Sequence, residues 1–397
     1  MPALEEEVVP VGELTEFVES IVAPWREMAA FLEQDRDRGN GRLAIEGERY
    51  LLAYLAAGIA MVFESDPNYP QFVRFADPVC SWGINNPDGN YAFLAVDGGA
   101  SYRIIGDLGN APVIEFQVNA PTFTGAPRYR NTATRKRGDL TVGLDGSFEL
   151  FVGGPERSGN WLPLTPDAES VVFRQFFEDW GSARPARLAV ERLDRQYPPP
   201  PYSASDLDDR VRRLAAWHSS AGVYWIEMCR MGFEVENSLV FHPPSFSDWG
   251  GHQGQSYGFG NFLLGPDEAL VIDLEIPPCD YWMVQLSNRL WDSLDFDRRQ
   301  TSLNGAQARL DGDGHFRGVV SIDDPGVANW LDPGGNSWGA LMGRIIGAAE
   351  VPSVTCTVVR RKDLDEFLPA DTERVTRDVR DAVLRRRHLD SQLRQGY

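Results

Sequence analysis

The sequence predicts an α+β protein in which two related antiparallel β-sandwich or jelly-roll-like units are joined by helical segments. Short β-like runs separated by Gly, Pro, Asn and Asp clusters fill two long stretches of the 397 residues. Apolar residues at helical spacing fill the segments before, between and after them. The two β-rich stretches also share short motifs in the same order, which indicates an internal duplication.

Residues 1–75 predict an N-terminal helical segment. Apolar residues recur at helical spacing between Leu14 and Val22, and Pro24 interrupts the pattern. A longer helix is expected over residues 43–64, before Asp66-Pro67. Its uncharged run, residues 50–63, is shorter than the about 20 apolar residues that span a bilayer, so we expect a buried helix.

The first β unit is expected over residues 76–165, and a helical insert over residues 166–236. Within the insert, helices are predicted at 170–180 and 184–197 and again after the Pro-rich run 198–201. The second β unit is expected over residues 237–360. Alternating acids and arginines in the tail, residues 361–397, predict a solvent-exposed C-terminal helix.

The repeat rests on six motif pairs with an offset of about 170 residues. They are Trp82-Gly83 with Trp249-Gly250, Gly89-Asn90-Tyr91 with Gly260-Asn261-Phe262, Val113 to Gln117 with Trp282 to Gln285, Asp145-Gly146 with Asp313-Gly314, Asn160-Trp161-Leu162 with Asn329-Trp330-Leu331, and Arg174 with Arg344. The Asn-Trp-Leu segments are predicted to be structural corners, because Trp fills core space and Asn bonds local backbone. Function is therefore expected where the copies differ, or between them.

Composition restricts the class of partner. A formal net charge of -20 and a pI of about 4.7 favour a small-molecule or carbohydrate ligand over nucleic acid or a membrane. Four widely spaced cysteines form no CxxC or Cys/His pattern, and the first eight residues are acidic, so a reduced, cytoplasmic protein is expected. Oligomeric state stays open, with a homo-oligomer among the alternatives.

One candidate site lies in the Gly- and Pro-rich segment 242–257. His252 is predicted to be a general acid or base, with His242 as the alternative, because imidazole titrates near neutrality. Trp249 and Tyr257 are expected to form an apolar wall for substrate. A metal triad of both histidines with Asp248 is a weaker alternative, and no metal or cofactor is expected.

The other candidate segment, residues 288–304, occurs in this form only in the second copy. Asp295 and Arg299 are spaced to pair on one helical turn and are predicted to orient polar substrate groups. An ordinary surface ion pair is the alternative. Substrate contacts are also expected from Asn288, Trp291 and Asn304.

The sequence contains no Walker motif, GxSxG elbow, HExxH or strand–GxGxxG–helix unit, which disfavours ATP, NAD and serine-hydrolase chemistry. The hypothesis is a cofactor-independent hydrolase or lyase that acts on a small organic or sugar-like substrate. A non-catalytic carbohydrate- or ligand-binding protein is the main alternative, and a scaffold subunit is a third.

Residues 260–345 resemble the DUF1214 domain family, which often accompanies a domain called DUF1254. The resemblance rests on four segments in order, followed by Arg344: Pro266 to Leu270, Tyr281 to Leu286, Ser302-Leu303-Asn304, and Asp324 to Asp332. The first copy keeps only Asn160-Trp161-Leu162-Pro163 and Arg174. The resemblance implies a β-sandwich or jelly-roll-like fold and no particular activity.

Overall fold

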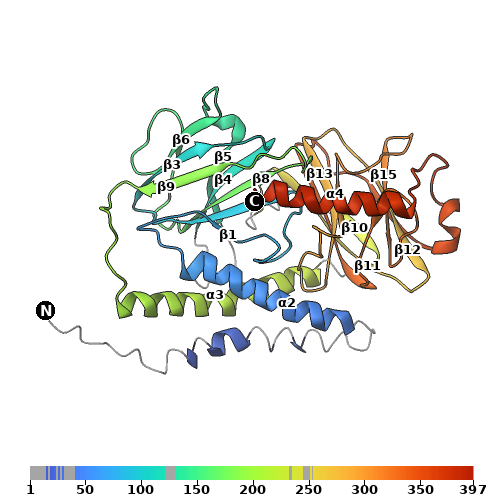
Figure 1. The fold of residues 1–397 in the computed structure, drawn as a ribbon, viewed down its shortest axis with the longest axis horizontal. Coiled ribbons are helices and arrows are strands. Elements are labelled where there is room, and N and C mark those ends of the chain that lie inside the picture. Colours follow the sequence, from blue (N-terminus) through green and yellow to red (C-terminus); the bar gives the residue numbers. More distant parts are fainter. Residues whose placement is uncertain are drawn as a thin grey trace.

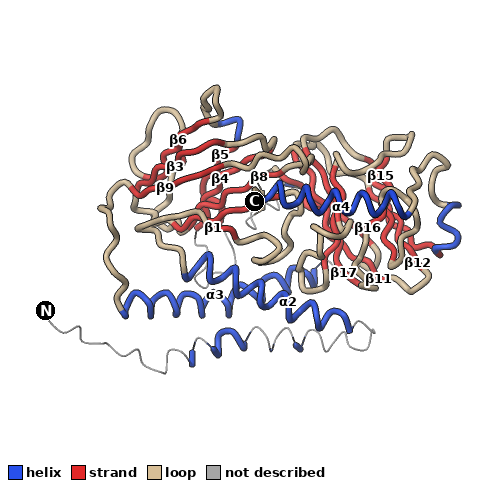
Figure 2. The backbone as a smooth tube through the Cα atoms, viewed as in Figure 1, coloured by secondary structure: helices blue, strands red, loops and turns tan. Residues whose placement is uncertain are grey.

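A computed structural model describes residues 15–16, 18–23, 26, 29–30, 41–120, 130–231, 235–244, 251–252 and 254–396 of the chain. Two β-sandwich units lie next to each other, with helices packed along them (Figures 1 and 2). The predicted α+β class with two antiparallel β units is confirmed.

The first unit consists of a five-stranded sheet in the order β1-β2-β8-β4-β5 and a four-stranded sheet in the order β7-β6-β3-β9. Neighbouring strands are antiparallel, except that β6 and β7 are parallel. The strands are β1 (Val73–Arg74), β2 (Gly89–Ala95), β3 (Ser101–Asp107), β4 (Val113–Ala120), β5 (Arg130–Lys136), β6 (Ser147–Gly153), β7 (Trp161–Leu162), β8 (Ser170–Phe176) and β9 (Arg187–Arg192).

The second unit has the same two sheets in the same order: β10-β11-β17-β13-β14 and β16-β15-β12-β18. Its strands are β10 (Ser238–His242), β11 (Gln255–Leu263), β12 (Glu268–Glu275), β13 (Tyr281–Ser287), β14 (Ser302–Asn304), β15 (His315–Ser321), β16 (Trp330–Leu331), β17 (Trp338–Ile346) and β18 (Val354–Arg360). Each strand of the first unit therefore has a counterpart nine strands later.

Strand pairing gives the correspondence residue by residue. Arg174 lies opposite Tyr91 and Glu115, and Arg344 lies opposite Tyr257 and Met283. Tyr91 thus corresponds to Tyr257, so the predicted match of Gly89-Asn90-Tyr91 with Gly260-Asn261-Phe262 is wrong by five positions. The predicted pairing of Arg174 with Arg344 agrees with the strand register.

The Asn-Trp-Leu corners make the same contacts in both units. Asn160 exchanges two hydrogen bonds of 2.8 Å with the backbone of Thr141, and Asn329 does the same with Arg309 at 2.8 and 2.6 Å. The indole of Trp161 donates to the carbonyl of Gly153, and that of Trp330 to the carbonyl of Ser321. These segments are scaffold, as predicted.

Helices cover one side of the molecule. Helix α2 (Gly41–Gly58) continues as a π-helical turn, η2 (Ile59–Phe63), and packs with α3 (Ala204–Met231) through a buried cluster that includes Tyr54 and Trp217 (Figure 1). The same cluster contains Phe93 of β2, so these helices cover part of the five-stranded sheet of the first unit. The helix predicted at residues 43–64 is confirmed. Short 3-10 turns are η3 (Arg137–Asp139) and η5 (Arg361–Glu366).

The C-terminal helix α4 (Arg377–Gln395) exists as predicted and exposes one face to solvent, but its other face is buried, which the sequence did not predict. Three of its arginines, Arg380, Arg387 and Arg394, enter the fold and are buried. Arg387 donates to the carbonyl of Phe296 and its guanidinium lies 4.4 Å from the ring centroid of Trp180. Arg394 donates to the carbonyl of Gly89 at 2.7 Å. Contacts of Arg387 and Arg394 thus hold α4 against both units.

The predicted helical insert is wrong in its first half. Residues 170–176 and 187–192 form the strands β8 and β9, which complete the first unit, and only α3 is helical. Strand β8 is buried on both faces, so its side chains show no two-residue alternation. A short, continuously buried run cannot be assigned to helix or strand from periodicity alone. No helix of the described residues is long and apolar enough to cross a membrane.

Candidate functional site

The two units meet through the outer faces of their five-stranded sheets, and we call this contact the seam. Its apolar part consists of Tyr91, Val113 and Phe176 of the first unit with Tyr281, Met283 and Ile346 of the second. Phe176 and Tyr281 stack with ring centroids 5.6 Å apart. Side chains alternate along a strand, so Arg174 shares the seam face with Phe176, while Phe173 points into the sandwich core.

One end of the seam carries an acid, an imidazole and a guanidinium from both units; we call Glu115, Arg174, His252 and Tyr257 the histidine end. Glu115 is fully buried, and its Oε1 accepts a 2.8 Å hydrogen bond from Nη1 of Arg174. Its Oε2 lies 3.4 Å from Nε2 of His252, whose side chain is 3% exposed. The Tyr257 hydroxyl accepts a 2.9 Å hydrogen bond from the backbone N–H of His252.

An aromatic row extends from the histidine end along the same face of the second unit. Tyr257 stacks on Phe259 and Phe259 on Trp291, with centroids 6.1 and 5.9 Å apart. His242 lies opposite Tyr257 in the strand register, and its ring lies 5.7 Å from that of Phe259. The structure therefore brings together four of the predicted residues: His242, His252, Tyr257 and Trp291.

Trp291 adopts a left-handed backbone conformation with φ of 61° and is 1% exposed. A bulky residue in this region of backbone space is strained, and the surrounding contacts must hold it there. The side chain of Asn288 does so, because its Oδ1 accepts hydrogen bonds from the backbone of Leu290 and Asp292. Asn288 is thus a loop-shaping residue, and its Nδ2 donates to Glu46 of α2 at 3.2 Å.

A second polar group of the seam is centred on a buried acid of the first unit; we call Asp88, Trp180, Tyr281 and Asn304 the aspartate end. The ring of Phe176 lies between the two groups, 5.9 Å from that of His252 and 5.6 Å from that of Tyr281. Asp88 accepts hydrogen bonds from the indole of Trp180, the hydroxyl of Tyr281 and the amide of Asn304 at 2.7–2.8 Å. Burial raises the pKa of Asp88, which these three donors oppose. Asn304 therefore joins the second unit to Asp88 and Glu178 of the first.

The predicted partnership of Asp295 and Arg299 is wrong. Asp295 accepts from Arg298 at 3.1 Å, and Arg299 donates to Asp332 at 2.9 Å. A backbone turn does form, since the Arg299 N–H bonds the Asp295 carbonyl, but the two side chains diverge. Both acid–arginine pairs lie outside the histidine end. Trp249 and Asp248 lie outside the described residues.

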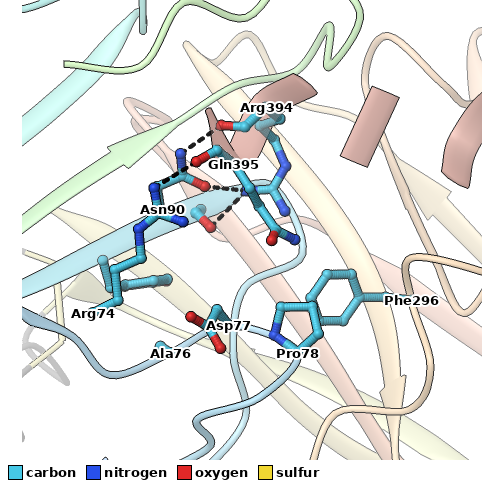
Figure 3. A pocket seen from close by; sticks show the side chains of 10 residues that line it. Arg74, Ala76, Asp77, Pro78, Asn90, Phe296, Arg394 and Gln395 are labelled. Carbon is cyan, nitrogen blue, oxygen red and sulfur yellow. Dashed lines mark hydrogen bonds between the residues drawn. The ribbon is translucent and has the colours of Figure 1, made fainter. Parts of the chain in front are cut away.

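Two adjoining crevices open at the surface beside the seam. The first, of about 290 Å³, lies between Arg74, Asn90 and the end of α4 (Figure 3). Asn90 and Arg394 bond each other there through both side chains and the Arg394 carbonyl. The second, of about 320 Å³, is lined by Asp77, Ser81 and Asp292. Burial raises the pKa of Asp292 to about 7.

The sequence pattern did not predict Glu115 as a site residue. It predicted Arg174 and Arg344 only as equivalent positions of the repeat. A signal was present, because Glu115, Gln117 and Asn119 alternate with apolar residues along one strand. Their meaning depends on the second unit covering the outer face of the sheet. Among the described residues, no three His, Cys, Asp or Glu side chains gather where they could hold a metal ion.

Comparison with known proteins identifies a fold relative. No family model and no curated protein matches the sequence. The crystal structure of an uncharacterised protein from Burkholderia cenocepacia is similar, with a TM-score of 0.76 and 28% identity, over 88% of this chain and 99% of that chain. A Vibrio parahaemolyticus protein aligns with a TM-score of 0.44 and 14% identity, over 79% of this chain and 100% of that chain, too weakly to carry an argument. The chain thus shares its two-unit fold with the Burkholderia protein.

Proposed function

We propose that this protein is a cofactor-independent enzyme, a hydrolase or a lyase, that acts on a small organic substrate at the histidine end. The observation that supports this proposal is the arrangement of Arg174, Glu115 and His252, which come from both units and meet in a buried contact. Titratable groups that converge from different elements away from bulk water are typical of acid/base sites.

Each group has a distinct role in the proposal. Arg174 fixes one carboxylate oxygen of Glu115, which leaves the other directed at Nε2 of His252. A carboxylate in this position orients an imidazole and stabilises its protonated form. The other ring nitrogen, Nδ1, would then exchange the proton with substrate. Gln117 supports the arrangement, because its Oε1 accepts from the same guanidinium nitrogen.

Both reaction classes use this proton exchange. In hydrolysis, His252 takes a proton from water, the water oxygen bonds to the substrate carbonyl carbon, and the proton passes to the leaving group. In elimination, His252 takes a proton from carbon, the electron pair forms a double bond, and the departing group receives the proton. No oxidant or reductant is needed in either case.

Non-catalytic ligand binding is a second candidate, with an aromatic or sugar-like ligand stacked on Tyr257 and Phe259. The observation that favours it is that both rings are half-buried rather than fully packed. Stacking on aromatic side chains provides affinity without any proton transfer. The two candidates differ in whether the bound compound is converted.

A substrate-depletion screen tests the proposal. The full chain is incubated with a library of small esters, amides, lactones and hydroxy acids, and depletion is followed by mass spectrometry. His252→Gln should slow depletion about 10²–10⁴-fold, which is the usual contribution of a positioned proton carrier. His242→Gln is the matched control, because the His242 ring lies on the same face but packs against Phe259, and it should stay within about tenfold of wild type.

Two outcomes decide between the candidates. Depletion at the wild-type rate by His252→Gln would contradict the enzymatic proposal. Compounds that bind but are never depleted by wild type would favour ligand binding without catalysis.

We also propose that the chain belongs with the DUF1214 family and works in a reducing compartment such as the cytoplasm. The motifs between Pro266 and Arg344 support the first point. The thiols of Cys80, Cys279 and Cys356 are all free, which supports the second. The origin of the two units by duplication is supported by their shared strand order.

A further inference from the structure

We propose that Arg344 is the binding group for a carboxylate of the substrate, so that the enzyme acts on small organic monocarboxylates. This inference rests on the proposed function for what happens to the ligand, but the binding site itself is argued independently.

Arg344 is a buried cation that has no acidic partner among the described residues. It is 4% exposed, and its hydrogen-bond partners are neutral: the Gln285 side chain, the carbonyl of Ile84 at 3.2 Å and the sulfur of Met283 at 3.5 Å. Buried charges in proteins are normally paired with an opposite charge, because desolvation is costly. A guanidinium has five N–H donors, so these three contacts leave donors for a ligand.

The first unit shows how the same position is neutralised. Arg174 corresponds to Arg344, and Glu115, opposite it in the register, is its ion-pair partner at 2.8 Å. In the second unit that position is Met283. The scaffold therefore contains two equivalent buried arginines and a single acid between them. A bound monoanion would supply the missing charge.

The groups around Arg344 suit a carboxylate. Tyr91 and Tyr257 lie opposite Arg174 and Arg344, and burial raises the pKa of both phenols, so they remain protonated hydrogen-bond donors. Guanidinium binds a carboxylate through two parallel hydrogen bonds, which fixes the plane of the ligand. The neighbouring aromatic row favours an organic anion over a small hydrated one.

The position of Tyr257 relates this binding group to the proposed chemistry. Its hydroxyl contacts the backbone of His252, and its strand position is opposite Arg344. A carboxylate held by Arg344 would therefore have its carbon chain beside His252. For elimination, the carbon next to the carboxylate is the atom whose proton is most readily removed.

Binding of benzoate to the full-length protein tests the inference. Benzoate provides a carboxylate on an aromatic ring, acetate provides a carboxylate alone, benzamide is the neutral isostere of benzoate, and inorganic phosphate reports on anions in general. Benzoate should raise the melting temperature with increasing concentration and give a saturable titration, whereas benzamide and phosphate should not. Arg344→Gln should weaken benzoate binding at least about tenfold, because a charge-assisted pair is lost.

A second variant keeps the test independent of any folding defect in Arg344→Gln. Met283→Glu copies the ion pair of the first unit and should raise the melting temperature of the free protein while it removes the benzoate effect. Val358→Glu is the matched control, because it adds the same charge at an exposed position of β18, and it should bind benzoate like wild type.

The possible results separate this inference from the proposed function. No stabilisation by benzoate or acetate, an equal effect of phosphate, or undiminished benzoate binding in both Arg344→Gln and Met283→Glu would overturn the carboxylate site. His252→Gln should still bind benzoate within about threefold of wild type, because it does not touch the anion. Loss of benzoate binding in Arg344→Gln together with normal turnover in His252→Gln would leave the carboxylate site standing and contradict the enzymatic proposal.

Discussion

The two ends of the seam are built from equivalent parts of the two units but contain different polar groups: one is centred on Asp88 and the other on His252. Asn86 and Asp88 precede Tyr91 by five and three residues, and they contact the sheet of the second unit through Tyr281 and Asn304. His252 and Gly254 precede Tyr257 by the same intervals, and His252 contacts Glu115 of the first unit. Each unit thus packs the residues that precede its second strand, β2 or β11, against the sheet of the other unit.

The difference lies in how the polar groups are satisfied. At the aspartate end, three donors bond Asp88, and Arg387 and Arg394 of α4 lie near enough to interact with its charge. At the histidine end, glycine replaces the aspartate, and Lys136 lies where the other end has Asn304. One copy of this contact therefore joins the units, while the other carries groups suited to proton transfer and anion binding.

The largest effect is expected from breaking the aspartate end. Asp88→Ala leaves three buried donors without their acceptor and removes the acid near two buried arginines of α4. The free energy of unfolding should fall by about 3–5 kcal/mol. Urea denaturation measures this, with Asp365→Ala as control, because that acid is exposed and should cost less than about 1 kcal/mol. A loss below about 1 kcal/mol for Asp88→Ala would show that this end is not the structural one.

A smaller loss is expected when the first unit is given the composition of the second. Glu115→Met leaves Arg174 without its acid, as Arg344 is, and places two uncompensated guanidinium groups in the seam. Stability should fall by about 3 kcal/mol, and added benzoate should restore part of it. Glu149→Met, which removes an exposed partner of Arg103, is the control. Equal effects of the two substitutions would contradict the role of Glu115 as counter-ion.

The hairpin after β13 adds a pH-dependent feature to the second unit. Burial disfavours the charge of Asp292 and raises its pKa to about 7 in the fold, from an ordinary value of 3.8. As the pH rises, Asp292 ionises near pH 4 in the unfolded chain but only near pH 7 in the folded protein. The stability that the neutral buried acid provides below pH 4 is therefore lost between about pH 4 and 7. Asp292→Asn stays neutral and should be more stable than wild type at pH 8 by on the order of 2 kcal/mol.

Unfolding free energies of both proteins at pH 4.5 and 8 measure this difference. Asn can still accept the 2.8 Å hydrogen bond from Ser81, so the comparison isolates the charge. A difference between the two proteins that does not change with pH would rule out titration of Asp292 in this range.

The smallest effect is expected where the units agree. Asn160→Ala and Asn329→Ala each remove two equivalent bonds to a neighbouring loop, Asn160→Ala also removes a bond to the Glu149 carbonyl, and each should cost about 1–2 kcal/mol. Asn329 should cost the larger amount, because it is buried and Asn160 is partly exposed. Thermal unfolding of both variants checks this, and a difference above about 2 kcal/mol would show that the corners are not equivalent.

The sequence predicted the scaffold better than the site. Turn residues and periodic apolar runs sufficed for the α+β class, the helix at 43–64 and the Asn-Trp-Leu corners. Strand β8 was not predicted because it is buried on both faces, so its side chains lack the two-residue alternation that marks a strand. Strand β9 was not predicted because a short run does not distinguish strand from helix. The burial of one face of α4 was not predicted, because arginine is usually a surface residue and its aromatic and carbonyl partners here come from distant parts of the sequence.

Within the site, His252, His242, Tyr257 and Trp291 could be chosen because they cluster in loops of one copy. Glu115 could not, since its contact with His252 spans 137 positions and depends on how two sheets pack. Asp295 and Arg299 were predicted to pair from their local spacing alone, but Arg299 pairs with Asp332, which is distant in the sequence. Local spacing predicts helical neighbours only when no better partner lies elsewhere in the fold.

A crystal structure of the full chain with benzoate bound would test the central claim most directly. We expect the carboxylate within hydrogen-bonding distance of Arg344, flanked by Tyr91 and Tyr257, and the ring beside His252. Benzoate bound at the aspartate end, or in the crevice beside Arg74 and Arg394 with Arg344 unchanged, would contradict the assignment of the two ends.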